Sequence, residues 1–141
     1  MNDEEKNIFQ QKYLEFQLLE QQIHEVYKQQ QILNHKLQEL TKLEENLSFL
    51  EKGKYKKQLF AQIGSKFFLK AELKDNKQVL VNVGANIMTE KPIEEAKQLV
   101  SFEIKETNDV LNEINQHLIN ASVKLQDLQY ELEELQNKSE K

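Results

Sequence analysis

The chain has 141 residues, of which 30% are charged, with three glycines, one proline and no cysteine or tryptophan. This composition is typical of long amphipathic helices and argues against a compact domain with a large core of its own. Without cysteine, neither disulfides nor thiolate metal sites can form. The N-terminal residues lack a signal-peptide pattern, and no apolar run approaches the roughly 18 residues that span a bilayer, so we expect a cytoplasmic protein without membrane association.

The net charge of −5 is unevenly distributed along the chain. Residues 1–50 carry nine acidic and five basic side chains, residues 51–91 carry four and nine, and residues 92–141 carry eleven and five. Two acidic segments therefore flank a basic one. The three segments coincide with the elements predicted below.

Residues 5–52 are predicted to form one coiled-coil helix, because apolar residues follow a heptad and neither glycine nor proline interrupts them. Nine of its twelve seam positions are apolar, and Gln30 and Glu44 are polar breaks, a feature that usually fixes register. Gly53 suits the end of the helix. The seam positions are Phe9, Lys12, Phe16, Leu19, Ile23, Val26, Gln30, Leu33, Leu37, Leu40, Glu44 and Leu47.

Residues 56–91 are predicted to form two β-hairpins, because the pattern of Gln62–Leu69 is repeated by Asn82–Thr89. In each copy a polar and a β-branched residue precede glycine, and two large apolar residues follow. We expect Gly64 and Gly84 to supply the positive φ angles that tight hairpin turns require. Residues 74–77 read as the turn between the hairpins.

Two such hairpins make a poor domain on their own, since their apolar face and outer edges lack partners. We therefore predict that they join hairpins of other chains. The candidate oligomerisation residues are Ile63, Gly64, Phe67, Phe68, Leu69, Leu73, Val79, Val81, Val83, Gly84 and Ile87.

Residues 92–137 are predicted to form the second helix, with Pro92 at its first position. Ten of its eleven seam positions are apolar, and it should pair with the first helix as an antiparallel coiled coil that brings Phe9 near Leu135 and Leu47 near Val100. A parallel dimer through one helix is the competing arrangement, at a higher entropy cost. The seam positions are Val100, Ile104, Thr107, Leu111, Ile114, Leu118, Ala121, Leu125, Leu128, Leu132 and Leu135.

Further apolar residues lie off the seam. Near the hairpins, five are expected to pack beneath the sheet: Leu43, Phe49, Leu50, Leu99 and Phe102. At the other end no sheet is available, so the apolar residues there should be exposed and should require a partner. They are Ile8, Tyr13, Leu14, Leu18, Ile119, Val123 and Tyr130.

No catalytic arrangement is evident, and we predict that the chain is not an enzyme and has no cofactor or metal. His24, His35 and His117 form no metal-ligand pair, and Gly64 and Gly84 belong to no phosphate-binding loop. The basic segment could suggest nucleic acid, but the sequence contains no arginine. Lysines that protect sheet edges explain the charge better, so no nucleic-acid partner is expected.

Taken together, these motifs closely resemble the α-class subunit of the prefoldin family. The resemblance rests on Ile63-Gly64-Ser65, on residues 68–75, on residues 79–85 and on Glu90-Lys91, between two long helices. It covers essentially the whole chain, and the presence of two hairpins instead of one indicates the α class.

The resemblance implies a mostly α fold with a small β region, in which a long antiparallel coiled-coil hairpin carries two β-hairpins that join an oligomeric β-barrel. It implies a hexamer of two α-class and four β-class subunits. It also implies an ATP-independent holdase that captures unfolded polypeptides at the coiled-coil tips and passes them to a group II chaperonin. The candidate client-binding residues are Ile8, Phe9, Tyr13, Leu14, Leu18, Val123, Leu128, Tyr130, Leu132 and Leu135.

Two other functions remain open at this point. The chain could be a structural protein that assembles with copies of itself into filaments through its own hairpins. It could also be a coiled coil that binds nucleic acid through the basic segment, which a steep dependence of binding on salt would reveal.

Overall fold

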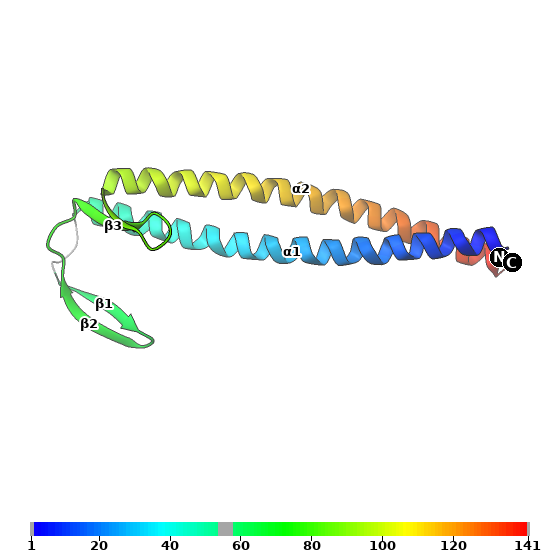
Figure 1. Ribbon diagram of the computed structural model, residues 1–141, viewed down its shortest axis with the longest axis horizontal. Coiled ribbons are helices and arrows are strands. Elements are labelled where there is room, and N and C mark those ends of the chain that lie inside the picture. The colour runs from blue at the N-terminus through cyan, green and yellow to red at the C-terminus, as the bar shows by residue number, and fades with distance from the viewer. Residues whose placement is uncertain (1, 54–57, 141) are drawn as a thin grey trace. The chain divides into compact units, whose positions relative to one another are not determined.

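The computed structural model describes residues 2–53 and 58–140. Helix α1 (Asp3–Glu51) is followed by strands β1 (Gln58–Gly64), β2 (Phe67–Glu72), β3 (Gln78–Asn82) and β4 (Met88–Pro92), and then by helix α2 (Ile93–Ser139) (Figure 1). Two units are described separately below. The paired-helix unit comprises the chain up to Lys36 and from Thr107 onward, and the hairpin unit comprises residues 37–106.

Helix α1 begins with a reciprocal cap. The side chain of Asn2 accepts a hydrogen bond from the backbone N–H of Glu5 (2.8 Å), and the Glu5 carboxylate accepts one from the backbone N–H of Asn2 (3.2 Å). Asp3, Glu4 and Glu5 also place negative charge in the first turn, at the positive end of the helix dipole. These contacts start the helix two residues earlier than the heptad pattern predicts.

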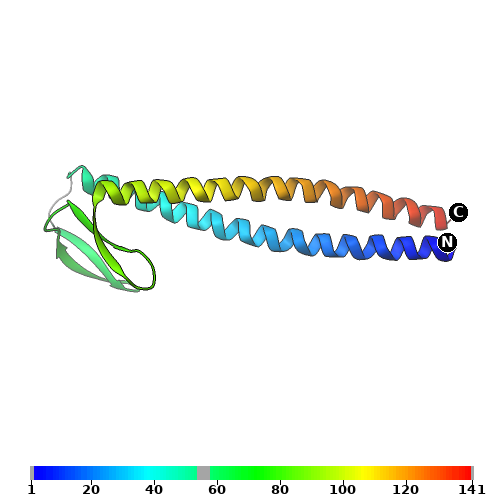
Figure 2. The same cartoon turned by 45° about the horizontal axis from the view of Figure 1, so that its top comes forward.

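In the paired-helix unit, α1 and α2 lie side by side and run antiparallel, with both chain ends at the same end of the unit (Figures 1 and 2). Lys12 pairs with Glu131, Lys124 lies 3.4 Å from Glu15, and the Gln30 side chain donates a hydrogen bond to Asn115. Every predicted seam residue of this unit is buried or half-buried, and Leu111, Ala121 and Leu128 are the most enclosed of the apolar ones. The predicted antiparallel pairing is confirmed.

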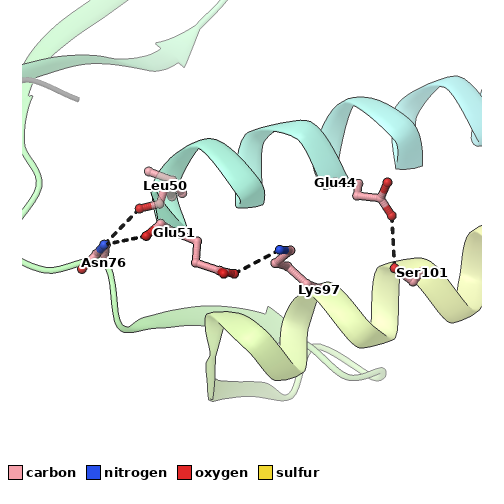
Figure 3. Close-up of polar contacts among 6 residues, drawn as sticks. All are labelled: Glu44, Leu50, Glu51, Asn76, Lys97 and Ser101. Carbon is pink, nitrogen blue, oxygen red and sulfur yellow. Dashed lines mark hydrogen bonds and ion pairs between the residues drawn. The ribbon is translucent and has the colours of Figure 1, made fainter. Parts of the chain in front are cut away.

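The hairpin unit has a small core where the two helices meet β3. Leu40 and Leu47 of α1 pack with Ala96 and Val100 of α2, and three partly buried side chains cover them: Val79, Val81 and Ile104. Polar contacts flank this core, since Ser101 donates a hydrogen bond to Glu44 (3.1 Å) and Lys97 forms an ion pair with Glu51 (3.2 Å) (Figure 3). The polar seam position Glu44 is thus satisfied across the helix pair.

The four strands form two separate antiparallel hairpins, as predicted, and the described chain contains no closed barrel. In the first hairpin Gln58 pairs with Glu72 and Gly64 with Phe67, with a bulge between Gln62 and Gly64. The residue with positive φ in its turn is Lys66 (70°), so the prediction that Gly64 supplies this angle is wrong. The bulge moves the turn past the glycine, and the reversal falls on Ser65 and Lys66.

In the second hairpin the prediction for the turn glycine is correct. Gly84 has a φ of 120°, and Ala85 and Asn86 are left-handed at 49° and 61°. The backbone N–H of Ile87 donates to the carbonyl of Gly84 (2.9 Å), and that of Val83 donates to the carbonyl of Ile87 (2.9 Å). Although the two turns have similar sequences, they have different geometries.

The helix boundaries next to the hairpins differ slightly from expectation. Gly53 has a φ of 63° just beyond α1, as predicted for a residue that ends a helix. Pro92, however, is the last residue of β4, where it pairs with Gln78, and α2 begins at Ile93. The backbone N–H of Ile93 donates to the carbonyl of Lys77 (3.1 Å), so the connection between the hairpins fixes the start of the helix.

Candidate assembly and client-binding surfaces

The first hairpin buries almost nothing against the rest of the described chain. Every residue of β1 is exposed, and in β2 only Ala71 is half-buried. Phe60 and Phe67 are 69% and 70% exposed. A surface of this kind on an isolated two-stranded hairpin requires a partner. We call it the hairpin surface, and it comprises Leu59, Phe60, Ile63, Phe67, Phe68 and Leu69.

The second hairpin is attached to the helices on one face. Val79 and Val81 pack against the small core, whereas Leu80, Val83, Ile87 and Met88 are exposed. The candidate oligomerisation residues therefore divide into two groups. Val79 and Val81 pack inside this chain and Leu73 is half-buried, whereas the other apolar candidates are exposed: Ile63, Phe67, Phe68, Leu69, Val83 and Ile87.

Beside β3 lies an apolar groove of about 750 Å³. Leu43, Leu50 and Leu99 line it, but of these only Leu50 is half-buried, since Leu43 and Leu99 are 43% and 41% exposed. The expectation of packing beneath the sheet is wrong for Phe49 and Phe102, which are 53% and 59% exposed. The short strand β3 covers the face that carries Leu47 and Val100, and both phenylalanines lie on the f positions of their heptads, away from it.

In the paired-helix unit, six of the candidate client-binding residues are exposed. Their exposed fractions run from 44% for Ile8 to 62% for Tyr130. Ile119, also expected to be exposed, is 59% exposed. We call the six residues the end surface, and they are Ile8, Tyr13, Leu14, Leu18, Val123 and Tyr130.

The other four candidates lie in the seam. Leu128 is only 5% exposed, and Phe9, Leu132 and Leu135 are half-buried. The helices remain paired there and hold these side chains between them, so Leu128 could contact a client only if the helices separate. Phe9 also stacks on Tyr13, with ring centroids 6.3 Å apart, and this contact holds the tyrosine ring at the edge of the seam.

Tyr130 contributes an uncharged ring to the end surface. A hydrogen bond with the carboxylate of Glu134 raises its pKa, and the negative charge of the same carboxylate and a small desolvation effect act in the same direction. The phenol therefore stays protonated well beyond neutral pH. Deprotonation adds no charge to this surface under ordinary conditions.

The described part of the chain contains neither a cluster of metal ligands nor a membrane-spanning helix. Among residues 2–53 and 58–140, no three His, Asp or Glu side chains are grouped so that they could hold a metal ion. No helix in these ranges is long and apolar enough to cross a bilayer.

Comparison with known proteins identifies the family of this chain. The family model described as "Prefoldin subunit" matches residues 19–138. The chain belongs to the prefoldin family. The resemblance drawn from the hairpin motifs is thereby confirmed.

Two individual prefoldins are similar to this chain. A prefoldin subunit alpha of Methanobrevibacter smithii is 29% identical over 97 residues, which cover 63% of this chain and 66% of that relative, just under two thirds. A filamentous PFD from Methanocaldococcus jannaschii, solved by cryo-EM, matches with a TM-score of 0.69 and 23% identity over 82% of this chain and 95% of that one. The second similarity supports the fold.

One residue with a clear structural role was missed by sequence reasoning. Asn76 had been assigned only to the turn between the hairpins, yet its side chain donates hydrogen bonds to the end of α1 (Figure 3). No local pattern announces this contact, because its acceptors lie 26 and 25 positions earlier in the chain.

Proposed function

We propose that this chain is an α-class prefoldin subunit that assembles through its hairpins and holds unfolded polypeptides at its end surface without using ATP. The observation that carries the proposal is the end surface itself. Six apolar or aromatic side chains are exposed on a helix pair whose seam is already filled, in a member of the prefoldin family. They are available to a client because they do not hold the helices together.

Assembly is supported by the hairpin surface. Its six apolar residues lack cover in the described chain, and the adjacent strand edges lack hydrogen-bonding partners. Two hairpins per chain and the similarity to a prefoldin subunit alpha favour the α class. The proposed complex contains two copies of this chain and four β-class subunits.

Client capture in this proposal depends on several subunits acting together. Each buried methylene contributes only about 0.8 kcal/mol, so one end surface binds an unfolded segment weakly. Several end surfaces around one space hold the same client with a much higher effective affinity. The proposed complex then transfers the client to a group II chaperonin, with acidic helix surfaces that favour a basic docking site and lose attraction at high salt.

Native mass spectrometry of the chain mixed with a β-class prefoldin subunit tests the assembly. We expect a species with two copies of this chain and four of the partner. Removal of residues 1–14 and 129–141 then tests the client site, since the truncated complex should form but should no longer suppress the aggregation of an unfolded protein. If the truncated complex still suppressed aggregation, the client-binding site would have to lie away from the end surface, in the cavity of the complex or close to the hairpins.

A second function deserves the same experiment, because the M. jannaschii protein is filamentous. This alternative is a structural protein that assembles with itself through the hairpin surface. A ladder of homo-oligomers, without any species that contains the β-class partner, would favour it.

A further inference from the structure

The connection between the two hairpins is attached to the ends of both helices. The Asn76 side chain donates a hydrogen bond from Nδ2 to the carbonyl of Leu50 (3.0 Å) and lies 3.5 Å from that of Glu51 (Figure 3). The next residue, Lys77, accepts a hydrogen bond from the backbone N–H of Ile93 (3.1 Å). Two consecutive residues therefore contact the last turn of α1 and the first residue of α2.

The acceptors at the end of α1 are groups that a helix cannot satisfy by itself. The last four carbonyls of an α-helix have no intrahelical N–H partner, and they form the negative end of its dipole. Here the carbonyl of Leu50 receives the backbone N–H of Gly53 (3.2 Å) as well as Nδ2 of Asn76. Among the described residues, the amide group of Asn76 supplies the bond to that oxygen that comes from outside the helix end.

The neighbouring residue makes a different bond that organises the turn itself. The carboxylate of Asp75 accepts a hydrogen bond from the backbone N–H of Lys77 (3.0 Å). Position 75 therefore requires an acceptor, and position 76 requires a donor. A Cβ at position 53 would lie 3.7 Å from Nδ2 of Asn76, an ordinary van der Waals contact, so a side chain there is disfavoured by the φ of 63° and not by the space beside Asn76.

We propose that Asn76 is a positioning residue for assembly, because its amide group fixes the point from which the exposed first hairpin leaves the helices and the second hairpin docks on them. This inference rests on the proposed assembly through the hairpins. In the first hairpin only Ala71 is half-buried, so among the described contacts the bonds of Asn76 and Lys77 are the ones that tie it to the helices, whereas β3 is held by Val79 and Val81. Loss of the donated bond leaves the seam intact and relaxes the base of the first hairpin.

A residue exchange offers a sharp test. The double variant Asp75→Asn/Asn76→Asp has the same composition and net charge as the natural chain. It keeps an acceptor at position 75 and replaces the donor at position 76 by a carboxylate that faces two carbonyls. The single variant Asp75→Asn is the matched control, since its amide oxygen still accepts from Lys77. The variant Asn76→Gln restores an amide donor.

Assembly of each variant with the β-class partner is measured by native mass spectrometry over a concentration series, with helix content measured by circular dichroism. We expect the exchange variant to assemble about tenfold more weakly, with unchanged helix content, because a hydrogen bond to a buried or partly buried group has an effect of that order. We expect Asp75→Asn to match the natural chain and Asn76→Gln to recover most of the affinity. Among these variants, only Asp75→Asn/Asn76→Asp should show faster hydrogen–deuterium exchange at the Ile93 amide.

The outcomes separate the two proposals. If the natural chain forms no assembly with the partner or with itself, the proposed function fails. If the natural chain assembles and the exchange variant assembles equally well, the role of Asn76 is wrong. Equal weakening in Asn76→Gln would also overturn it, because assembly would then depend on the size of the side chain and not on its donor.

Discussion

Lys12 of α1 forms an ion pair with Glu131 of α2, 119 positions later in the chain, although Lys12 occupies a seam position that apolar residues normally fill. The pair is partly exposed, with 32% and 47% of the two side chains accessible. Pairs of this kind contribute less than about 1 kcal/mol. A leucine at the same position would add apolar area to the seam.

We therefore expect Lys12→Leu to raise the free energy of unfolding by about 1 kcal/mol. Glu131→Ala should lower it by about 0.5 kcal/mol, since it leaves the ammonium group half-buried without its partner. Thermal melts followed by circular dichroism measure both changes. A loss of stability in Lys12→Leu would show that the ion pair is worth more than the packing that replaces it.

Seam and surface leucines should respond very differently to truncation. Leu128 is 5% exposed and Leu14 is 57% exposed. Leu128→Ala should lower the free energy of unfolding by about 2–3 kcal/mol, because it opens a cavity between the helices. Leu14→Ala should change it by less than about 0.5 kcal/mol. Urea unfolding of the two variants compares them directly, and equal losses would contradict the assignment of Leu14 to the free surface.

The end surface predicts a change in activity without a change in stability. In the double variant Leu14→Ser/Leu18→Ser, suppression of aggregation by the assembled complex should fall several-fold while its melting temperature stays within a few degrees. Ile32→Ser is the matched control, since Ile32 is 69% exposed on the same helix and has the same heptad position as Leu18. An equal loss in the control would mean that general surface hydrophobicity, and not the end surface, binds clients.

The two turn glycines should differ in their tolerance of a side chain. Gly84 has a φ of 120°, where a Cβ is strained, whereas Gly64 has no positive φ and no neighbour within 4 Å of a Cβ. Gly84→Ala should destabilise the second hairpin by about 1–3 kcal/mol, and Gly64→Ala should be neutral or slightly stabilising. The melting temperature of the assembled complex reports both effects, and strong loss in Gly64→Ala would indicate that a neighbouring subunit approaches that backbone.

Local sequence patterns were sufficient for most of the fold. A heptad records which side of a helix is apolar, and all the predicted seam positions, including the polar Gln30 and Glu44, are buried or half-buried. In the second hairpin Val79 and Val81, two positions apart, share the face that packs against the core, whereas Val83, the next valine in the alternation, is 53% exposed. Residues on one face of a helix are three or four positions apart, and those on one face of a strand are two apart, so periodicity in the sequence detects both.

The errors have causes that are not local. The bulge before Gly64 shifts the turn to Lys66, and residues 62–69 and 82–89 look alike although only one of them contains this shift. Leu128 was placed in the seam and on the surface at once, because an apolar pattern cannot show whether paired helices separate towards their ends. The role of Asn76 depends on carbonyls 25 and 26 positions away.

The exposed first hairpin also has a consequence for the stability of an unassembled chain. Two strands without cover are only marginally stable in water, and exposed β edges attract other edges and proteases. Until a neighbour covers β1 and β2, the chain displays Phe60, Phe67 and Phe68 to every degradation system that recognises exposed aromatic residues. If the proposed assembly is correct, a partner that covers β1 and β2 would therefore also protect this chain from proteolysis.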